Sequence, residues 1–350
     1  MRVVVTGATG NVGTSVLRAL VHETRVESIV GLARRRPEMV WPKTSWVEAD
    51  VSRDDLRPHF EAADAVVHLA WLIQPSRDLA TLQATNVEGS RRVFHAAGSA
   101  GVGALVYASS VGAYSPGPKE RRVDESWPTG GIPSSFYSRH KAEVERQLDL
   151  FEREFPAVRT VRLRPGLIFK REAAAEIRRY FAGPFLPGAL LRRPLIPFVP
   201  DVDGLRFQAV HSHDVGQAYR LAIVGDVSGA FNIAAEPVLD PRELADLLGA
   251  RAVRVPQAAL RAGAELTWRL RLQPSPPGWV DMALNAPLMD VTRAREELGW
   301  EPRHSSRHAL MDLLHGMRDG SGVETPPLAP SAGGPLRVRE LVTGVGGTSR

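Results

Sequence analysis

Arg2-Val3-Val4-Val5-Thr6-Gly7-Ala8-Thr9-Gly10-Asn11-Val12-Gly13 is the stretch of this 350-residue chain that decides its fold. Its apolar start predicts a strand, and Asn11–His22 predicts a helix. Between them, Gly7 permits a tight turn, Gly10 lets the backbone approach a pyrophosphate, and Gly13 allows close helix–strand packing. This context predicts a dinucleotide-binding loop, although the spacing is G-x-x-G-x-x-G and not the usual G-x-G-x-x-G. The alternative is a plain glycine-rich turn.

Downstream, short apolar strands alternate with helical segments, which is typical of a doubly wound parallel sheet. The predicted strands are Arg2–Val5, Ser28–Leu32, Ser45–Glu48, Ala65–Leu69, Ala104–Ala108 and Thr160–Leu163. The predicted helices between them are Asn11–His22, Asp54–Phe60, Asp78–Ala100 and Ser134–Phe155. We therefore expect an α/β fold, with a Rossmann-type sheet and a smaller C-terminal substrate lobe.

The strand–helix rhythm breaks after Pro165. Residues 183–204 carry five prolines and three glycines, which predicts loops. Later segments predict a helix at His213–Val224, a short strand at Phe231–Ile233 and a helix at Pro241–Leu248. We expect a dinucleotide-binding domain at 1–165 with return elements near 205–225, a substrate lobe at 166–204 and 226–315, and a Gly/Pro/Ser-rich tail at 316–350, in which Leu336–Val345 could dock on the body.

Composition excludes several classes of protein. The chain has 43% hydrophobic residues, enough for a sizeable core, and no cysteine, which excludes disulfides and cysteine-ligated metals. It has no run of 18 apolar residues, and its start becomes glycine-rich too soon for a signal peptide, so we expect a cytoplasmic protein without a membrane span. The net charge of +5 arises from arginines scattered among acids, which argues against nucleic acid as a partner.

Tyr137 and Lys141 lie four residues apart in a predicted helix, and Ser110 follows a predicted strand. A phenol has a pKa of about 10, but a lysine on the same helix face favours the phenolate and lowers that pKa. A serine hydroxyl steadies the oxygen that gains or loses the proton. Lysine is rare here: of 44 basic residues, forty are arginine and four are Lys43, Lys119, Lys141 and Lys170. The three residues predict a hydride-transfer site; the alternative is an ordinary amphipathic helix with an exposed tyrosine.

The end of the second predicted strand bears on the choice of cofactor. An NAD site usually places an acid there for the ribose hydroxyl, whereas this chain has Arg34 and Arg35. Because an arginine pairs with a 2′-phosphate, the sequence favours NADP over NAD. The alternative is a solvated run of arginines beside a site that binds NAD.

Further motifs recur in order along the chain. They are Asp50-Val51, His68-Leu69-Ala70, Asn86-Val87-Glu88-Gly89, Tyr107-Ala108-Ser109-Ser110, Arg164-Pro165-Gly166, Val210-His211-Ser212-His213-Asp214 and Leu298-Gly299-Trp300. With the glycine loop and the Tyr137–Lys141 pair, residues 1–315 resemble the extended short-chain dehydrogenase/reductase family, often called NAD-dependent epimerase/dehydratase.

The resemblance implies a role for each motif. The cofactor is expected to contact the glycine loop, including Thr9, Asn11 and Val12, together with Asp50, Val51, Leu69, Ala70, Pro165, Gly166, Tyr137 and Lys141. Ser110 would bind the substrate oxygen, and Asn86 would support the lysine through water. His211, His213 and Asp214 suggest a metal less than a helix cap formed by Asp214, so we expect no metal. The resemblance also leaves a homodimer open, through the helices near 78–100 and 134–155.

Departures from the family narrow the reaction. Dehydratases carry an Asp-Glu pair after the catalytic hydroxyl residue, where this chain has Val111-Gly112-Ala113, and decarboxylases place a glutamate nearby, which is missing here. Trp71 is bulky and apolar where sugar-nucleotide enzymes have small residues, which favours a less polar substrate; the alternative is a core tryptophan. We expect an NAD(P)-dependent reductase or dehydrogenase acting on a secondary alcohol or ketone. A nucleotide-sugar epimerase with retained cofactor is the alternative, and a non-catalytic dinucleotide sensor is third.

Overall fold

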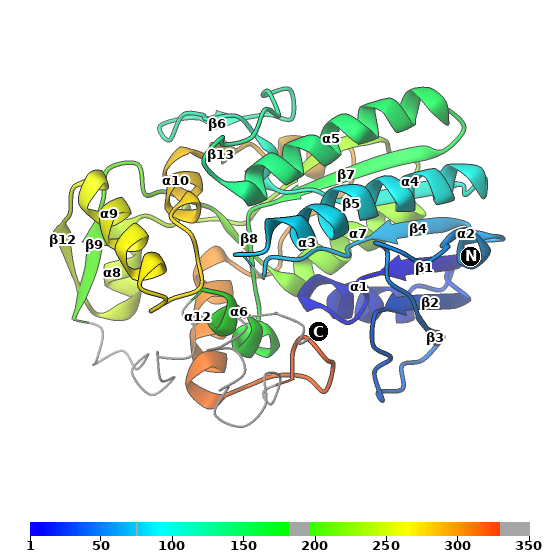
Figure 1. Cartoon of the computed structure of the whole chain (residues 1–350), viewed down its shortest axis with the longest axis horizontal. Coiled ribbons are helices and arrows are strands. Elements are labelled where there is room, and N and C mark those ends of the chain that lie inside the picture. The colour runs from blue at the N-terminus through cyan, green and yellow to red at the C-terminus, as the bar shows by residue number, and fades with distance from the viewer. Residues whose placement is uncertain (75, 182–196, 330–350) are drawn as a thin grey trace.

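A parallel sheet of seven strands runs through the centre of the molecule (Figure 1). The structure is a computed structural model that describes residues 1–74, 76–181 and 197–329. In spatial order the strands are β11 (Gly229–Ile233), β7 (Arg159–Pro165), β5 (Ala104–Ala108), β4 (Ala65–His68), β1 (Arg2–Thr6), β2 (Ser28–Ala33) and β3 (Thr44–Glu48). The chain order reverses beside β1, so the doubly wound Rossmann-type fold is confirmed.

Two layers of helices cover this sheet. On one face, α1 (Asn11–Val21) and α7 (Ser212–Val224) pack on Val3 and Val5 of β1. On the other, α4 (Gly89–Ser99) and α5 (Phe136–Glu154) share a second core with Val4. Successive side chains of a strand point to opposite faces, so the apolar run Val3–Val5 supplies both cores.

The six predicted strands all form, and so does the short strand predicted at Phe231–Ile233, whose place in this sheet corrects our domain boundary. β11 pairs with β7, from Gly229 beside Val161 to Ile233 beside Pro165. Residues 226–315 therefore do not belong to the substrate lobe alone. Phe231 and Ile233 are fully buried in the α1/α7 core, and α11 (Thr292–Glu296) packs beside β11. Burial of these apolar side chains returns the chain to the sheet.

Our predicted helix Asp78–Ala100 is in fact three segments. Asp78 caps α3 (Leu79–Gln83) by accepting a hydrogen bond from Thr81 N, a π-helical turn follows at Ala84–Glu88, and α4 completes the run. The predicted helix Asp54–Phe60 is reduced to α2 (Arg57–Phe60). Single-turn π-helices are frequent at functional sites, and this one contains Asn86.

The second lobe is built from short elements at the end of the molecule away from the N-terminus (Figure 1). Its parallel strand pairs are β8 (Leu167–Phe169) with β10 (Ala209–His211), β9 (Phe198–Asp201) with β12 (Arg251–Arg254), and β6 (Arg122–Val123) with β13 (Leu288–Met289). Its helices are α6 (Ala174–Phe181), α8 (Pro241–Leu248), α9 (Gln257–Arg269), α10 (Gly278–Asn285) and α12 (Ser306–Asp319).

The predicted tail begins later than residue 316. Helix α12 extends to Asp319, and beyond it Thr325 and Leu328 are fully buried. Residues up to 329 are therefore part of the folded body. The proposed docking of Leu336–Val345 lies outside the described residues.

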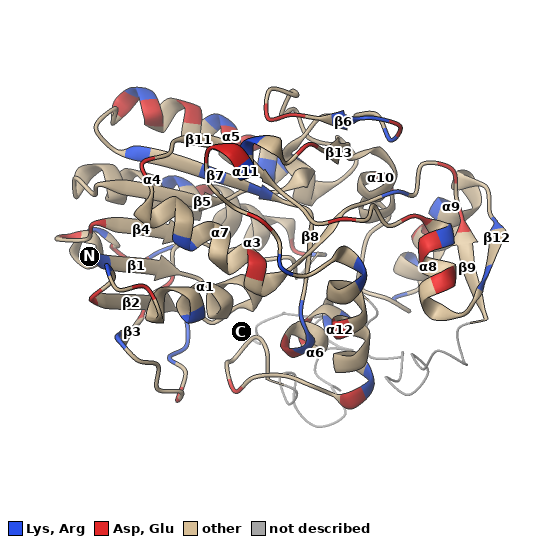
Figure 2. Cartoon of the chain, turned by 180° about the vertical axis from the view of Figure 1, so that it is seen from behind, with Lys and Arg blue, Asp and Glu red and all other residues tan. Residues whose placement is uncertain are grey.

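Charges of both signs are interspersed over the chain, for example along α5 (Figure 2). There, Arg146 pairs with Glu143 one helical turn away. Within residues 1–74, 76–181 and 197–329, no helix is long and apolar enough to cross a membrane.

Candidate active site

The glycine loop between β1 and α1 is shaped by close contacts with its own neighbours. Gly7 has a φ of +69°, and a Cβ there would lie 2.7 Å from Ala70 N. A Cβ on Gly13 would lie 2.4 Å from Gly7 O. Neither position accepts a side chain, since Cβ atoms do not approach backbone that closely. Gly10 differs, because its nearest neighbour would be Gly7 O at 3.5 Å.

The N-terminus of α1 fits a dinucleotide pyrophosphate. Gly10 is its N-cap and forms no side-chain capping bond, so the first N–H groups of the helix remain available to an anion. Asn11 Nδ2 donates to Ile168 O (3.2 Å), while Asn11 Oδ1 is buried with no hydrogen-bond partner. Thr9 is buried, and its carbonyl accepts a hydrogen bond from Thr325 Oγ1 (2.9 Å).

Lys170, which follows β8, lies directly behind this loop. Its Nζ donates to Asn11 O (2.7 Å), Thr14 Oγ1 (2.7 Å) and Ser15 Oγ (3.1 Å). Ser15 Oγ also hydrogen-bonds with Ser212 Oγ at the start of α7 (2.9 Å). The first turn of α1 is thus held by a buried ammonium, whose pKa burial lowers to about 8.

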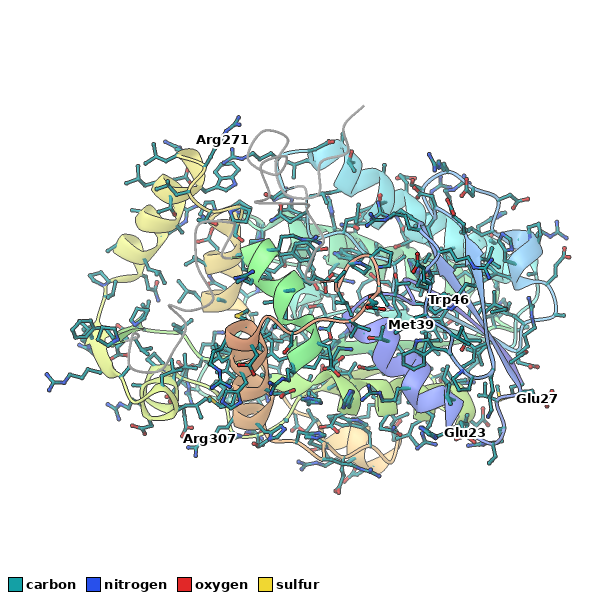
Figure 3. All side chains as sticks on the ribbon, turned by 90° about the horizontal axis from the view of Figure 1, so that it is seen from below. Glu23, Glu27, Met39, Trp46, Arg271 and Arg307 are labelled. Carbon is teal, nitrogen blue, oxygen red and sulfur yellow. The ribbon has the colours of Figure 1, made fainter. Side chains whose placement is uncertain are left out.

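The predicted adenosine side lies past β2 and β3. Arg34 and Arg35 are exposed, and the following loop folds back so that Trp46 Nε1 donates to Met39 O (3.1 Å; Figure 3). Burial pushes the pKa of Asp50 up, but hydrogen bonds from Ser52 and the charges of Arg34 and Arg53 together hold that pKa below its usual value. The Arg34 guanidinium therefore acts on the carboxylate predicted to lie near the adenosine.

Leu69, Ala70 and Val51, which we also predicted to contact the cofactor, are held by backbone hydrogen bonds or by core packing. Leu69 N donates to Thr6 O (3.1 Å) and Ala70 N to Thr6 Oγ1 (3.3 Å), which holds the turn after β4 against the glycine loop. Val51 is 5% exposed and packs in the α4/α5 core.

The structure brings Ser110 and Tyr137 together. Ser110 follows β5 and accepts a hydrogen bond from Gly112 N (3.0 Å). Tyr137 lies in the first turn of α5, capped by Ser135. Burial raises the pKa of Tyr137 to about 12, and a hydrogen bond with Ser110 partly opposes that rise.

Lys141 does not lower that pKa here, contrary to our expectation. Its Nζ donates to Ala108 O (2.5 Å) and Tyr107 OH (3.4 Å), and lies 5.9 Å from the centroid of the Tyr137 ring. The Trp71 ring covers the ammonium, with 3.5 Å from Nζ to its centroid. Burial also lowers the pKa of Lys141 well below its ordinary value.

Asn86 is fully buried and bonded to the turn after β4, while its support of Lys141 through water stays a prediction. Its Oδ1 accepts from Leu72 N (2.7 Å) and its Nδ2 donates to Leu72 O (2.8 Å). Both ends of the amide therefore fix the turn that carries Trp71, and in this structure the side chain has no hydrogen bond to Lys141. Asn86 is a positioning residue for that turn.

Pro165 and Gly166 end β7 at the same edge of the sheet. Gly166 N donates to Ile233 O (3.0 Å), and a Cβ on Gly166 would lie 2.5 Å from Gln208 O. Arg164 of the same motif points to a buried network, where its Nε donates to Glu145 Oε1 (2.8 Å).

The histidines around α7 serve packing and capping. His211, and not Asp214, caps α7, because its Nδ1 accepts from His213 N (3.2 Å). Asp214 Oδ2 instead accepts from His304 N (2.9 Å). Among the described residues, no group of three or more His, Cys, Asp or Glu has the geometry to hold a metal ion.

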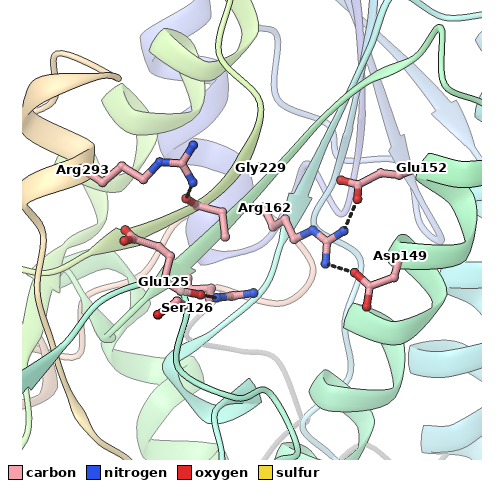
Figure 4. A pocket seen from close by; sticks show the side chains of 9 residues that line it. Glu125, Ser126, Asp149, Glu152, Arg162, Gly229 and Arg293 are labelled. Carbon is pink, nitrogen blue, oxygen red and sulfur yellow. Dashed lines mark hydrogen bonds and ion pairs between the residues drawn. The ribbon is translucent and has the colours of Figure 1, made fainter.

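An open hollow of about 410 Å³ lies elsewhere, between α5, β7 and β11 (Figure 4). Its Arg162 pairs with Asp149 (2.7 Å) and Glu152 (2.7 Å), and Arg293 donates to Ala230 O (2.8 Å). The cations of this hollow are already paired, so it is not part of the candidate site.

The residues that come together are those of an enzyme family. Residues 3–234 match the description "NAD dependent epimerase/dehydratase family". The chain belongs to the NAD dependent epimerase/dehydratase family. An uncharacterized protein of Mycobacterium tuberculosis (strain ATCC 25618 / H37Rv) is 28% identical over 331 residues, which is 92% of this chain and 31% of that protein. This member of the family thus spans about a third of the length of that relative.

Other relatives extend the comparison. A putative dihydroflavonol 4-reductase of Synechocystis sp. is 30% identical over 129 residues, 35% of this chain and 36% of that protein. The UDP-glucose 4-epimerase of Thermus thermophilus in complex with NAD is 20% identical, with a TM-score of 0.67 over 91% of this chain and 99% of that one. The UDP-glucose 4-epimerase of Thermotoga maritima with UDP-glucose is 22% identical, with a TM-score of 0.67 over 91% of this chain and 99% of that one. The two solved structures share the α/β fold of this chain.

Sequence reasoning missed three residues at the site. Trp279 of α10 packs on the Tyr137 ring and Phe181 of α6 packs on Trp279, but both lie more than forty residues from Tyr137 in the sequence. The one sequence feature that could have pointed to Lys170 is that lysine is rare in this chain, with four lysines among 44 basic residues.

Proposed function

We propose that this chain is an NAD(P)-dependent oxidoreductase that exchanges a hydride at the carbon of a secondary alcohol or ketone. The observation that supports this best is the hydrogen bond between Ser110 and Tyr137, one helical turn before Lys141. These side chains lie at the carboxyl edge of the sheet, where open α/β folds bind their ligands.

Each residue has a distinct role in this proposal. Tyr137 gives its phenolic proton to the substrate oxygen during reduction and takes one during oxidation. Ser110 donates a hydrogen bond to that same oxygen and fixes its position. Because Lys141 does not lower the pKa of Tyr137 in this structure, we assign Lys141 the other role that the family resemblance gives it, contact with the cofactor. When bound, the nicotinamide ring supplies or accepts the hydride.

Net reduction is the first candidate, and transient oxidation in an epimerase is the second. The apolar Trp71 beside Tyr137 and the name of the Synechocystis relative favour a reductase. The NAD-bound epimerases with the same fold favour the second candidate. A reductase consumes added reduced nicotinamide cofactor, whose absorbance then falls, whereas an epimerase causes no net change in the absorbance of the cofactor.

Cofactor choice belongs to the same proposal. The family description supports a nicotinamide dinucleotide as such. Arg34 beside Asp50, with Arg35 next to it, supports a preference for the 2′-phosphate of NADP. Any adenine contact of Val51 would involve its backbone, because its side chain is buried.

A homodimer through α4 and α5 is the assembly that we propose for this fold. Leu150 on α5 is 59% exposed and would be covered in such a dimer. Sedimentation of the wild type and of Leu150→Glu would test it, and a wild-type monomer would contradict it.

The test of the reaction is Tyr137→Phe, which removes only the proton-bearing oxygen. Turnover should fall by about 10²- to 10⁴-fold, the usual contribution of general acid–base catalysis, while cofactor affinity stays near that of the wild type. Tyr219→Phe, another buried tyrosine, is the matched control and should retain activity. More than about a tenth of wild-type kcat in Tyr137→Phe would contradict the proton-transfer role.

A further inference from the structure

Aromatic rings from separate parts of the chain enclose the Tyr137 phenol. The Trp279 ring lies 4.9 Å from it, centroid to centroid, at 37°. The Trp71 ring lies 5.8 Å away and meets it edge-on at 74°. Phe181 packs on Trp279 at 4.9 Å and is 37% exposed. We call Trp71, Tyr137, Trp279 and Phe181 the aromatic enclosure.

Tight contacts hold this enclosure in place. Asn86 clamps both backbone groups of Leu72, which fixes the turn that carries Trp71. Gly278 begins α10 so close to the start of α5 that a Cβ there would lie 2.4 Å from Ser134 O. Gly112 lets the phenol approach, since its Cβ would lie 3.0 Å from Tyr137 Cε1. Hydrogen bonds and close backbone approaches therefore fix the positions of these rings.

Two donors in the enclosure have no acceptor. Trp71 Nε1 and Trp279 Nε1 are both shielded from solvent and without a hydrogen-bond partner. Buried polar groups nearly always have partners, so these two N–H groups are exceptions that a ligand would satisfy. Trp268 Nε1 is also unpartnered, but its ring packs under Arg77, at 4.3 Å, and not against Tyr137.

This chemistry suits a flat aromatic molecule. Aromatic rings prefer edge-to-face or offset contacts with other rings. Trp71 meets the phenol edge-on and Trp279 packs on it at a tilt, so a flat aromatic substrate that reaches the phenol would meet these rings as well. The unpartnered indole N–H groups would then donate to an oxygen of that substrate. A sugar diphosphate requires cations and many hydrogen bonds, which ring faces do not supply.

We infer that the substrate is an aryl ketone, or the corresponding aryl carbinol, bearing a further oxygen acceptor on its ring system. The inference rests on the proposed function. In the reducing direction, the carbonyl carbon gains a hydride from the reduced nicotinamide cofactor as the C=O π bond breaks. The carbonyl oxygen takes the Tyr137 proton to form the O–H bond, and solvent returns a proton to Tyr137.

The test compares 6-methoxy-2-acetylnaphthalene with cyclohexyl methyl ketone, using NADPH and NADH, with alcohol products quantified by chromatography. UDP-glucose is assayed for epimerisation in parallel. We expect a kcat/KM for the naphthyl ketone at least about tenfold above that for the cyclohexyl ketone, because stacked aromatic contacts add to area burial. Trp279→Ala and Trp71→Ala should abolish this ratio, and Trp279→Phe should keep part of it.

Trp127→Ala is the matched control, because Trp127 packs in a different cluster with its Nε1 bonded to Ser115 O (3.3 Å). It should leave the ratio unchanged. Equal rates on the two ketones, no product from the naphthyl ketone, a preference for UDP-glucose, or an unchanged ratio in both Trp71→Ala and Trp279→Ala would each overturn the aromatic substrate class. Turnover that is insensitive to Tyr137→Phe would instead overturn the proposed function.

Discussion

Lysine is used in this chain where an ammonium can donate to a backbone carbonyl. The bonds are Lys43 to Glu23 O (2.9 Å), Lys119 to Arg206 O and Ala283 O (2.8 Å each), Lys141 to Ala108 O (2.5 Å) and Lys170 to Asn11 O (2.7 Å). An ammonium is a compact charge with rotatable donors, whereas guanidinium is a wide planar fork. Three of the four, Lys119, Lys141 and Lys170, are buried, where a compact ammonium needs less room than a guanidinium.

At the residue scale, Arg34 and Arg35 after β2 lead to a prediction about the preference for NADPH over NADH. If Arg34 or Arg35 pairs with the 2′-phosphate, the wild type binds NADPH more tightly than NADH. Loss of a charge-assisted contact costs about 1.5–3 kcal/mol, so Ala at a productive position should weaken NADPH about 10- to 150-fold. NADH binding should change little. Titration of both cofactors measures this.

Arg36→Ala provides the control, because Arg36 is exposed in the same run of arginines. It should not alter the ratio of the two affinities. Equal wild-type affinities for NADH and NADPH would contradict the assignment. The proposed roles of Ser110 and Tyr137 would stand, because they concern the nicotinamide end.

The candidate site was predictable only where it is local in sequence. Tyr137 and Lys141 share a helix face, and the glycine loop lies between one strand and one helix, so spacing alone groups them. The contact of Trp71 with the Lys141 ammonium depends on the turn after β4, which Asn86 sets through Leu72. No periodicity encodes such a contact.

The same limit applies to the elements. The strands that feed one βα unit after another follow from apolar runs and turn residues. The sequence predicts a strand at Phe231–Ile233 but not its place in the sheet, because several elements, among them α6 and α7, lie between β7 and β11 in the chain, and burial against α1 and α7 sets that place. The π-helical turn in residues 84–88 is likewise invisible in a helical pattern.

At the element scale, Glu145 joins α5 to β7 and supplies the prediction for stability. It is 1% exposed and pairs with Arg164 (2.8 Å) and Arg162 (2.9 Å), and it accepts from Ser109 Oγ (2.5 Å). Glu145→Gln leaves the buried Arg164 guanidinium without its carboxylate partner, whereas Arg162 keeps Asp149 and Glu152, so the change should cost about 3–5 kcal/mol of unfolding free energy. Denaturant unfolding at pH 7 measures this loss.

The same pair predicts a pH dependence. Burial raises the pKa of Glu145, but the Arg164 hydrogen bond and the charges of Arg164 and Arg162 outweigh it and lower that pKa from 4.5 to about 2. A depressed carboxyl pKa stabilises the fold above the unfolded-state pKa. The stability difference between wild type and Glu145→Gln should thus be full above about pH 5 and shrink as the pH falls toward 2.

Glu143→Gln on the same helix is the control for both measurements. Glu143 is 43% exposed and pairs with its exposed neighbour Arg146, so its loss should cost less than about 1 kcal/mol. A Glu145→Gln protein as stable as Glu143→Gln would show that the buried network contributes nothing net.

At the scale of the whole molecule, two buried lysines connect separate parts of the fold. Lys170 joins the end of β8 to the first turn of α1, and Lys119 joins the segment before β6 to α10. Burial lowers the pKa of each to about 8, so both ammonium groups are held in similar surroundings. They differ in what lies beyond them, because only Lys170 contacts the helix that carries the glycine loop.

Lys170→Met should therefore weaken NADH and NADPH alike, by about tenfold, which corresponds to about 1.4 kcal/mol. The variant loses both a positive charge near the expected pyrophosphate and the bond that holds Asn11 O. Lys119→Met removes an equally buried lysine and should leave both affinities unchanged. Calorimetric titration gives the affinities, and the melting temperature without cofactor shows that each variant is folded. If Lys170→Met were unfolded, Lys170→Gln, which keeps donors but not the charge, would be titrated in its place. Wild-type affinity in a folded Lys170 variant, or an equal loss in Lys119→Met, would show that Lys170 stabilises the fold without shaping the cofactor site.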